Sequence, residues 1–153
     1  MRRERVILLV EDNPNDEALT IRALRKNHVQ NQIVVAHDGA EALDYLFGTG
    51  DYADRDVFDL PEVVLLDVNL PKMDGLEVLR LIRQATLTAL LPVVVLTSST
   101  AESDLITSYA QGANSYVRKP VDFVRFQESV RQVGLYWLIV NEPPPRTGER
   151  KRL

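Results

Sequence analysis

Acidic, hydroxyl and ammonium side chains stand at the ends of short apolar runs in this chain. They are Glu11 and Asp12 after residues 6–10, Asp67 after residues 63–66, Thr97 after residues 93–96, and Lys119 after residues 115–117. Such runs are typical of strands that are buried on both faces of a parallel sheet. Parallel α/β sheets place their functional groups at the carboxyl ends of the strands. We therefore expect these side chains to meet at one edge of a sheet.

Converging carboxylates predict a site for a hard divalent cation. Mg²⁺ prefers oxygen ligands in octahedral geometry and keeps several of its waters. Asp12 and Asp67 are the expected direct ligands, and the longer Glu11 binds through water. The backbone carbonyl of Asn69 is a further candidate ligand. Without the cation, carboxylates about 4 Å apart repel each other by roughly 1 to 4 kcal/mol, depending on the dielectric.

Asp67 is the candidate nucleophile of the predicted site. A carboxylate can attack phosphorus and form an acyl phosphate if cations neutralise the charge that develops. Lys119 would supply a second cation beside the metal, and the Thr97 hydroxyl is expected at the same sheet edge. The sequence has no glycine-rich nucleotide loop, which agrees with a phosphoryl donor other than ATP. Together these residues predict magnesium-assisted phosphoryl transfer onto Asp67.

Each of these residues taken alone also has an ordinary structural explanation. The acids at 11–12, together with Asp16 and Glu17, could simply favour the positive start of the following helix. An aspartate at a strand end, such as Asp67, commonly accepts hydrogen bonds from loop amides. Lys119 could be a solvated surface group, and Thr97 could only begin a helix cap. The phosphoryl-transfer hypothesis therefore depends on the combination.

Strand and helix patterns alternate along the chain and would position these side chains. Helical spacing begins at Pro14, is broken over residues 28–31, and is followed by a strand at 33–36; further helical patterns cover 40–47 and 76–82. Ser99-Thr100-Ala101-Glu102 is typical of a capping box, which predicts a helix through Tyr109 that ends near Gly112. The alternation predicts a doubly wound α/β fold with five parallel strands in the order 2-1-3-4-5 and helices on both faces.

Two segments depart from this plan. Residues 48–61 are longer than a usual helix-to-strand connection, so we expect a surface insertion. Residues 142–153 contain Pro143-Pro144-Pro145 and end in basic residues, which predicts a disordered tail with extended polyproline character. The expected division is therefore one domain over residues 1–141 and a tail over 142–153.

Composition limits the classes of function. The chain has 153 residues, a hydrophobic share of 45% and a net charge of -4, which fit one soluble domain with no affinity for nucleic acid. It has no cysteine, which excludes disulfides and zinc-thiolate sites. The apolar segment behind the basic residues 2–5 is too short for an export signal or a membrane span. We therefore expect a cytoplasmic protein without membrane contact.

The last predicted helix carries more apolar residues than one sheet can cover. A stripe at helical spacing runs from Phe123 to Val140, but residues 135–140 are apolar around the whole circumference. Such a helix needs a second partner, which predicts a homodimer through this helix. The patch could instead dock onto the protein that supplies the phosphoryl group, or be covered by the tail. The expected interface residues are Phe126, Leu135, Tyr136, Trp137, Leu138 and Ile139.

The motifs together resemble the receiver domain of two-component response regulators. They are Glu11-Asp12-Asn13, Leu65 to Gly75 around Asp67, Thr97-Ser98, and Tyr116-Val117-Arg118-Lys119-Pro120. The resemblance covers about residues 5–140 and implies a flavodoxin-like fold. It implies Asp67 as phospho-acceptor, Glu11 and Asp12 as the acidic pair for Mg²⁺, and Lys119 on the phosphate. It also implies Thr97 and Tyr116 as the switch pair, and a cis bond between Lys119 and Pro120.

The resemblance further implies the partners and the output surface. The donor would be a histidine kinase, and the chain would promote its own phosphorylation and dephosphorylation. The output surface would comprise the helix after Thr97, the strand with Tyr116 and the last helix. The insertion and the tryptophan-bearing last helix are similar to stand-alone regulators that accompany bacterial phytochrome kinases.

Two other classes of function stay open on the sequence alone. A phosphatase of the haloacid-dehalogenase type also uses an aspartyl nucleophile and magnesium, but its motif places a second aspartate where this chain has Asn69. An interaction module with an inactive phosphate site would lack one of the key residues, and none is missing. Phosphate release tests the first alternative, and phosphorylation of Asp67 tests the second.

Overall fold

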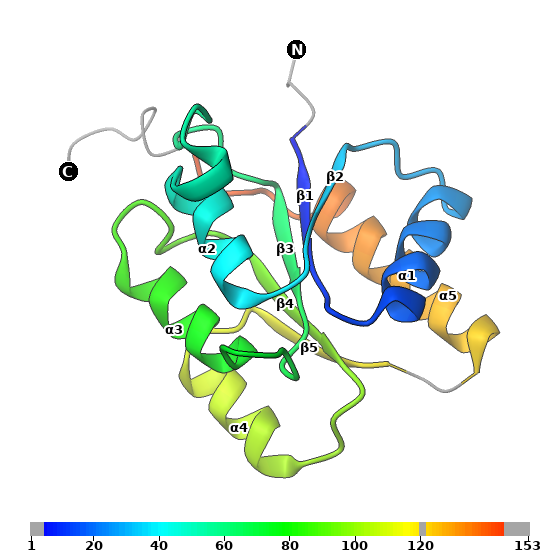
Figure 1. Ribbon diagram of the computed structural model, residues 1–153. Coiled ribbons are helices and arrows are strands. Elements are labelled where there is room, and N and C mark those ends of the chain that lie inside the picture. Colours follow the sequence, from blue (N-terminus) through cyan, green and yellow to red (C-terminus); the bar gives the residue numbers. More distant parts are fainter. Residues whose placement is uncertain (1–4, 120–121, 146–153) are drawn as a thin grey trace.

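A five-stranded parallel sheet forms the centre of the computed structural model, which describes residues 5–119 and 122–145 (Figure 1). The strand order is β2-β1-β3-β4-β5, as the sequence predicts. The two edge strands, β2 and β5, are less buried than the three central strands, which explains why the central runs are the most apolar. The strands are β1 (Ile7–Val10), β2 (Ile33–Ala36), β3 (Val63–Leu66), β4 (Val93–Thr97) and β5 (Ser115–Arg118).

Helices cover both faces of this sheet. Helices α1 and α5 pack on one face over a core that contains Ile7, Leu9 and Phe126. Helices α2 and α3 pack on the opposite face over a core that contains Leu8 and Val10. Alternate side chains of one strand thus enter different cores. The helices are α1 (Pro14–Lys26), α2 (Gly39–Phe47), α3 (Gly75–Gln84), α4 (Glu102–Ala110) and α5 (Phe123–Gly134).

Polar side chains cap the starts of α1, α2 and α3. The Asn13 side chain accepts hydrogen bonds from the backbone N–H groups of residues 15 and 16, and Pro14 occupies the first turn of α1. Asp38 caps α2, and Asp74 caps α3. These caps fix where each helix begins beyond the carboxyl edge of the sheet.

The capping box predicted at residues 99–102 is wrong. Helix α4 begins at Glu102, and its N-cap Ala101 makes no side-chain cap hydrogen bond. Ser99 instead donates a hydrogen bond from its hydroxyl to Asp104 at 2.6 Å and accepts one from the N–H of Ala101. The serine therefore stabilises the loop before the helix, which leaves the loop after β4 longer than the sequence pattern indicates.

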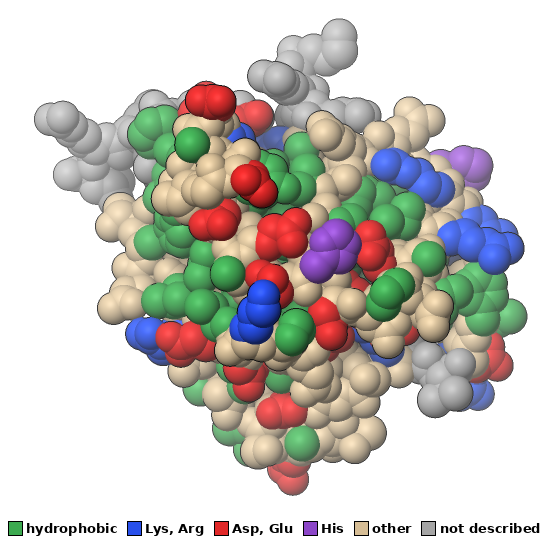
Figure 2. All heavy atoms as spheres, in the orientation of Figure 1, with side chains coloured by type: hydrophobic (Ala, Val, Ile, Leu, Met, Phe, Trp, Pro, Cys, Tyr) green, Lys and Arg blue, Asp and Glu red, His purple; other side chains and the backbone are tan. Residues whose placement is uncertain are grey.

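The insertion at 48–61 folds back onto α2. Its short 3₁₀ helix, Gly50–Tyr52, places the Tyr52 ring edge-to-face against Tyr45, with 5.1 Å between ring centroids. The Arg55 guanidinium lies over the Tyr45 ring and donates to the carbonyl oxygens of Tyr45 and Asp59. Figure 2 shows acidic side chains over this part of the molecule, where α2 and the insertion lie in Figure 1. The insertion is thus an ordered surface layer held by Arg55.

Helix α5 continues into a π-helical turn, Leu135–Val140. The predicted apolar stripe is buried at Phe126, Val130 and Trp137, but Val140 is 62% exposed. The prediction fails at Val140 because a π turn holds more residues than an α turn, so the spacing that brings residue 137 onto the core carries residue 140 away from it. The prediction that Phe126 and Trp137 form an interface also needs correction, because both are buried within the protomer.

Two expectations concern residues whose structure is not described. The predicted tail lies largely in residues 146–153, and the predicted cis bond involves Pro120; both lie outside the described ranges. The division at residue 141 therefore stays a prediction. Within the described ranges, every helix is too short or too polar to cross a bilayer.

Candidate functional site

Backbone hydrogen bonds between neighbouring strand ends position the predicted site residues. The N–H of Glu11 donates to the carbonyl of Ala36, and the N–H of Asp67 donates to the carbonyl of Val10. On the other side of the sheet, the N–H of Lys119 donates to the carbonyl of Thr97 at 2.7 Å. Each functional residue thus prolongs the hydrogen-bonding pattern of the sheet by one position, which gives its side chain a rigid base.

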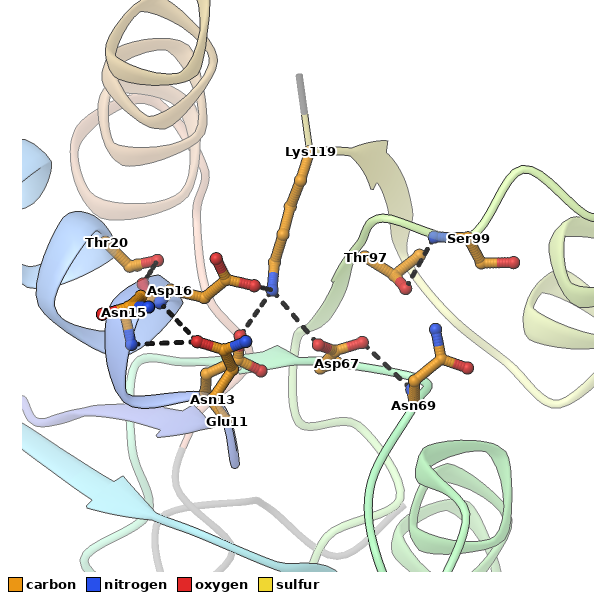
Figure 3. A network of polar contacts seen from close by, with 10 residues as sticks. All are labelled: Glu11, Asn13, Asn15, Asp16, Thr20, Asp67, Asn69, Thr97, Ser99 and Lys119. Carbon is orange, nitrogen blue, oxygen red and sulfur yellow. Dashed lines mark hydrogen bonds and ion pairs between the residues drawn. The ribbon is translucent and has the colours of Figure 1, made fainter. Parts of the chain in front are cut away.

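The Lys119 ammonium lies at the centre of the site (Figure 3). Its nitrogen is 2.6 Å from Glu11 Oε1, 3.1 Å from Asp67 Oδ2 and 3.1 Å from Asp16 Oδ2. An ammonium has three N–H donors, and three carboxylates accept here. The side chains of Lys119, Glu11 and Asp67 are all at least nine-tenths buried, so solvent screens these contacts little.

Burial and mutual proximity give the two buried carboxylates different proton affinities. Burial raises the pKa of Glu11 well above its usual range, and the neighbouring Asp67 raises it further. Burial alone would raise the pKa of Asp67 too, but Glu11, Lys119 and the N–H of Asn69 together hold it below its usual value. The pKa of Lys119 is raised despite burial, because carboxylates surround the ammonium. The lowered pKa of Asp67 favours its ionised form, as a nucleophile requires.

The residues present fit a divalent metal ion. Ligand oxygens of Glu11, Asp12 and Asp67 all lie within 4.8 Å of one another. Glu11 Oε2 is buried and has no hydrogen-bond partner among the described residues, while its other oxygen is held by Lys119. Asp12 is exposed at the mouth of this group. An unpartnered buried carboxylate oxygen facing two further carboxylates is the donor set of a hard cation. No described contact bears on the carbonyl of Asn69, whose role as a ligand stays a prediction.

Thr97 and Tyr116 lie on neighbouring strands without a direct hydrogen bond between their hydroxyls. The fully buried Thr97 accepts a hydrogen bond from the N–H of Ser99 at 3.2 Å. The Tyr116 hydroxyl is buried and has no hydrogen-bond partner within the described part of the chain. The structure thus places Thr97 beside Asp67, on the side away from Asp16 (Figure 3), and leaves the switch role of the two residues as a prediction.

Asp16 is a member of the site that the sequence analysis did not identify. It was interpreted only as one of the acids at the start of a helix, which is where the structure places it, in the first turn of α1. The one available signal was its position in the first turn of the helix that follows Glu11 and Asp12, because this helix begins at the same edge of the sheet. Its contact with Lys119 cannot be found from spacing alone.

Known proteins are similar to this chain in sequence and in fold. A family model described as the response regulator receiver domain matches residues 7–131. The response regulator Rcp1 of Synechocystis sp. is 37% identical over 134 residues, which are 88% of this chain and 89% of Rcp1.

Two solved structures extend the similarity to three dimensions. The phosphorylated cyanobacterial phytochrome response regulator RcpA is 36% identical with a TM-score of 0.86, and the alignment covers 94% of this chain and all of RcpA. The bacteriophytochrome response regulator AtBRR is 50% identical with a TM-score of 0.74, over 92% of this chain and all of AtBRR.

Proposed function

Because the chain belongs to the response regulator receiver domain family, we propose that it is a stand-alone response regulator that accepts a phosphoryl group from a histidine kinase on Asp67. The observation that carries this proposal is the position of Asp67: its side chain is buried at a strand end, and the Lys119 ammonium lies 3.1 Å from its Oδ2. Receiver domains are signalling domains, and this chain would promote its own phosphorylation and dephosphorylation without acting on other substrates.

The divalent ion of this site would be Mg²⁺, held by Glu11, Asp12, Asp67 and the carbonyl of Asn69. Glu11 Oε2 supports this choice because it is a buried oxygen without a partner. The solved Mn²⁺-bound form of Rcp1 supports a divalent ion in this kind of site. When bound, the ion neutralises charge on the transferring phosphoryl group. Phosphoryl-transfer sites commonly use magnesium, which fits a set of oxygen donors.

In the proposed reaction, a carboxylate oxygen of Asp67 attacks the phosphorus of a phosphohistidine. A phosphorus–oxygen bond forms, the phosphorus–nitrogen bond breaks, and the histidine nitrogen keeps the electron pair and takes up a proton from water. Asn69 holds the Asp67 side chain in place by donating its N–H to Oδ1 at 3.0 Å. Lys119 would then pair with a phosphoryl oxygen, since its ammonium already lies within hydrogen-bond reach of Asp67.

We propose that the signal leaves the site through Thr97 and Tyr116. A phosphoryl group adds about -1.5 to -2 charge and strong acceptors, which would draw the Thr97 hydroxyl toward Asp67. Among the described residues the buried Tyr116 hydroxyl has no hydrogen-bond partner, so no such bond has to break when its position changes. The output surface would then be formed by α4, β5 and α5.

The phosphoryl donor would be a histidine kinase of the bacteriophytochrome type. This proposal is supported by RcpA and AtBRR, which are named as phytochrome and bacteriophytochrome response regulators and match nearly the whole chain. We propose no nucleic-acid or membrane partner, because the net charge is -4.

Labelling by a phosphohistidine donor tests the proposed function. Incubated with an autophosphorylated bacteriophytochrome kinase and Mg²⁺, the purified protein should take up phosphate in an acid-stable, alkali-labile form, as an acyl phosphate does. Chelation of the divalent ion by EDTA should reduce labelling to background, and added Mg²⁺ should restore it. Labelling that persists unchanged in EDTA would contradict the metal assignment, and no labelling from any histidine donor would contradict the function.

We also propose that the protein forms a homodimer through the end of its last helix. Four apolar side chains at this end are at least 45% exposed: Leu135, Tyr136, Ile139 and Val140. Leu138 is partly buried against the core and would lie at the rim of this patch. Each large apolar side chain that is withdrawn from water contributes roughly 1.5 to 3 kcal/mol. A two-fold axis would bury the same patch on both subunits, which is the commonest closed arrangement.

The dimer should dissociate when charge is introduced into this patch. Combining Tyr136→Asp with Ile139→Asp places two carboxylates in the interface, and we expect sedimentation to show a monomer at tens of micromolar that still accepts phosphate. Ile106→Asp, on the exposed face of α4, is the matched control and should leave the dimer intact. Trp137 is left unchanged because its removal would open a cavity in the core. A wild-type monomer, or dissociation by Ile106→Asp alone, would contradict the proposed interface.

A further inference from the structure

Lys119 uses all of its hydrogen-bond donors before any phosphoryl group arrives. Its three N–H groups face carboxylate oxygens of Glu11, Asp16 and Asp67 at 2.6, 3.1 and 3.1 Å. An ammonium has three donors, so contact with a phosphoryl oxygen requires that one of these carboxylates give up its place. The contact between Lys119 and a phosphoryl group therefore depends on which carboxylate leaves the ammonium.

Asp16 is the carboxylate that can leave. Glu11 and Asp67 stand at the ends of central strands, are almost fully buried, and belong to the group that fits the metal. Asp16 lies on α1, its side chain is 35% exposed, and it lies outside that group. In Figure 3 it approaches the ammonium from the side opposite to Asp67. A hollow of about 380 Å³ between α1 and α5 is lined by both Asp16 and Lys119, which gives a released carboxylate access to water.

On this geometry we propose that Asp16 is a positioning residue. In the resting protein its carboxylate accepts the Lys119 N–H that would otherwise donate to a phosphoryl oxygen. Its carboxylate competes with the phosphoryl group for the ammonium and adds a negative charge beside the incoming dianion. The competition would set how tightly the site holds a phosphoryl group and how long Lys119 stays engaged with it. This inference rests on the proposed function of the same site, since it needs a phosphoryl group on Asp67.

The competition predicts a gain of affinity when the carboxylate is removed. Asp16→Asn keeps the shape of the side chain and removes its charge. In calorimetric titrations with beryllofluoride, an anion that mimics a phosphoryl group on aspartate, we expect this variant with Mg²⁺ to bind about threefold to tenfold more tightly than the wild type. A residue with a merely structural role would give unchanged or weaker binding, so the sign of the change is diagnostic.

Glu17→Gln is the matched control. Glu17 lies in the same first turn of α1 and its loss changes the net charge equally, but its carboxylate faces His37 at 3.3 Å. We expect its beryllofluoride affinity to stay within about twofold of the wild type. Asp16→Glu keeps the charge and should also stay near the wild-type value.

Two results would overturn the role of Asp16. The first is Asp16→Asn binding the anion no more tightly than the wild type. The second is a parallel loss of affinity for Mg²⁺ alone and for the anion, which would make Asp16 part of the metal group. A wild type that binds no beryllofluoride with Mg²⁺ would instead contradict the proposed function itself, so the two failures are distinguishable.

Discussion

The Asp67→Asn variant should take up no phosphate from a phosphohistidine donor or from acetyl phosphate. The amide has no ionised oxygen to attack phosphorus, and the other carboxylates at the site are occupied by Lys119 or expected to be occupied by metal. The fold should survive, because an asparagine oxygen can still accept the N–H of Asn69. Phosphate incorporation, measured beside the circular dichroism spectrum, separates loss of the acceptor from loss of structure.

Asp38→Asn is the control for this change. Asp38 also follows a strand at the same edge of the sheet, and its side chain accepts the N–H of Glu41 as the cap of α2. Asparagine is an equally good cap, so the control makes the same chemical change without touching the proposed acceptor. Full labelling of Asp38→Asn with none of Asp67→Asn is the expected pair of results. Undiminished labelling of Asp67→Asn would place the acceptor elsewhere.

The sequence predicts the sheet well because each strand is marked by a short run of neighbouring apolar residues. Runs such as Val63–Leu66 are apolar at every position since both faces of a central strand are covered, and strand order follows from right-handed crossovers. The end of α5 was harder to predict. The helix changes to a π turn at Leu135, next to Gly134, and no spacing of apolar residues reveals this change.

The site residues likewise divide into those that the sequence predicts and those whose position depends on the tertiary structure. Residues at strand ends, such as Glu11, Asp67 and Lys119, could be brought together from topology alone, and the structure does bring them together. Asp16 could not, because its contact depends on the direction in which α1 leaves the sheet edge. The proton affinities of Glu11 and Asp67 likewise depend on burial and on each other, which spacing does not reveal.

Gly75 is the residue whose role is visible only in the structure. The sequence marks it as the end of a turn-rich loop, but its N–H donates to the carbonyl of Val68 at 2.9 Å, which brings the start of α3 against the end of β3. A Cβ atom at this position would lie 2.1 Å from the carbonyl oxygen of Asp67 and 2.8 Å from the Cα of Val68. Both are backbone atoms of the proposed phospho-acceptor loop, so no side-chain rotation relieves the clash.

Gly75→Ala should therefore lower the free energy of unfolding by about 3 kcal/mol, since overpacking against backbone forces the chain to move. The backbone that must move to make room includes that of Asp67, so we also expect slower phosphorylation in the variant. Denaturant unfolding and labelling rates, measured at one protein concentration, check both effects.

Gly134→Ala is the matched control: its Cβ would meet the Val29 side chain at an ordinary 3.4 Å. Inside a helix this change should leave the stability unchanged or raise it by about 0.5 to 1 kcal/mol. Equal stability of the two variants would show that the loop at Asp67 yields freely, and the rigid support that we assign to the acceptor would then be wrong.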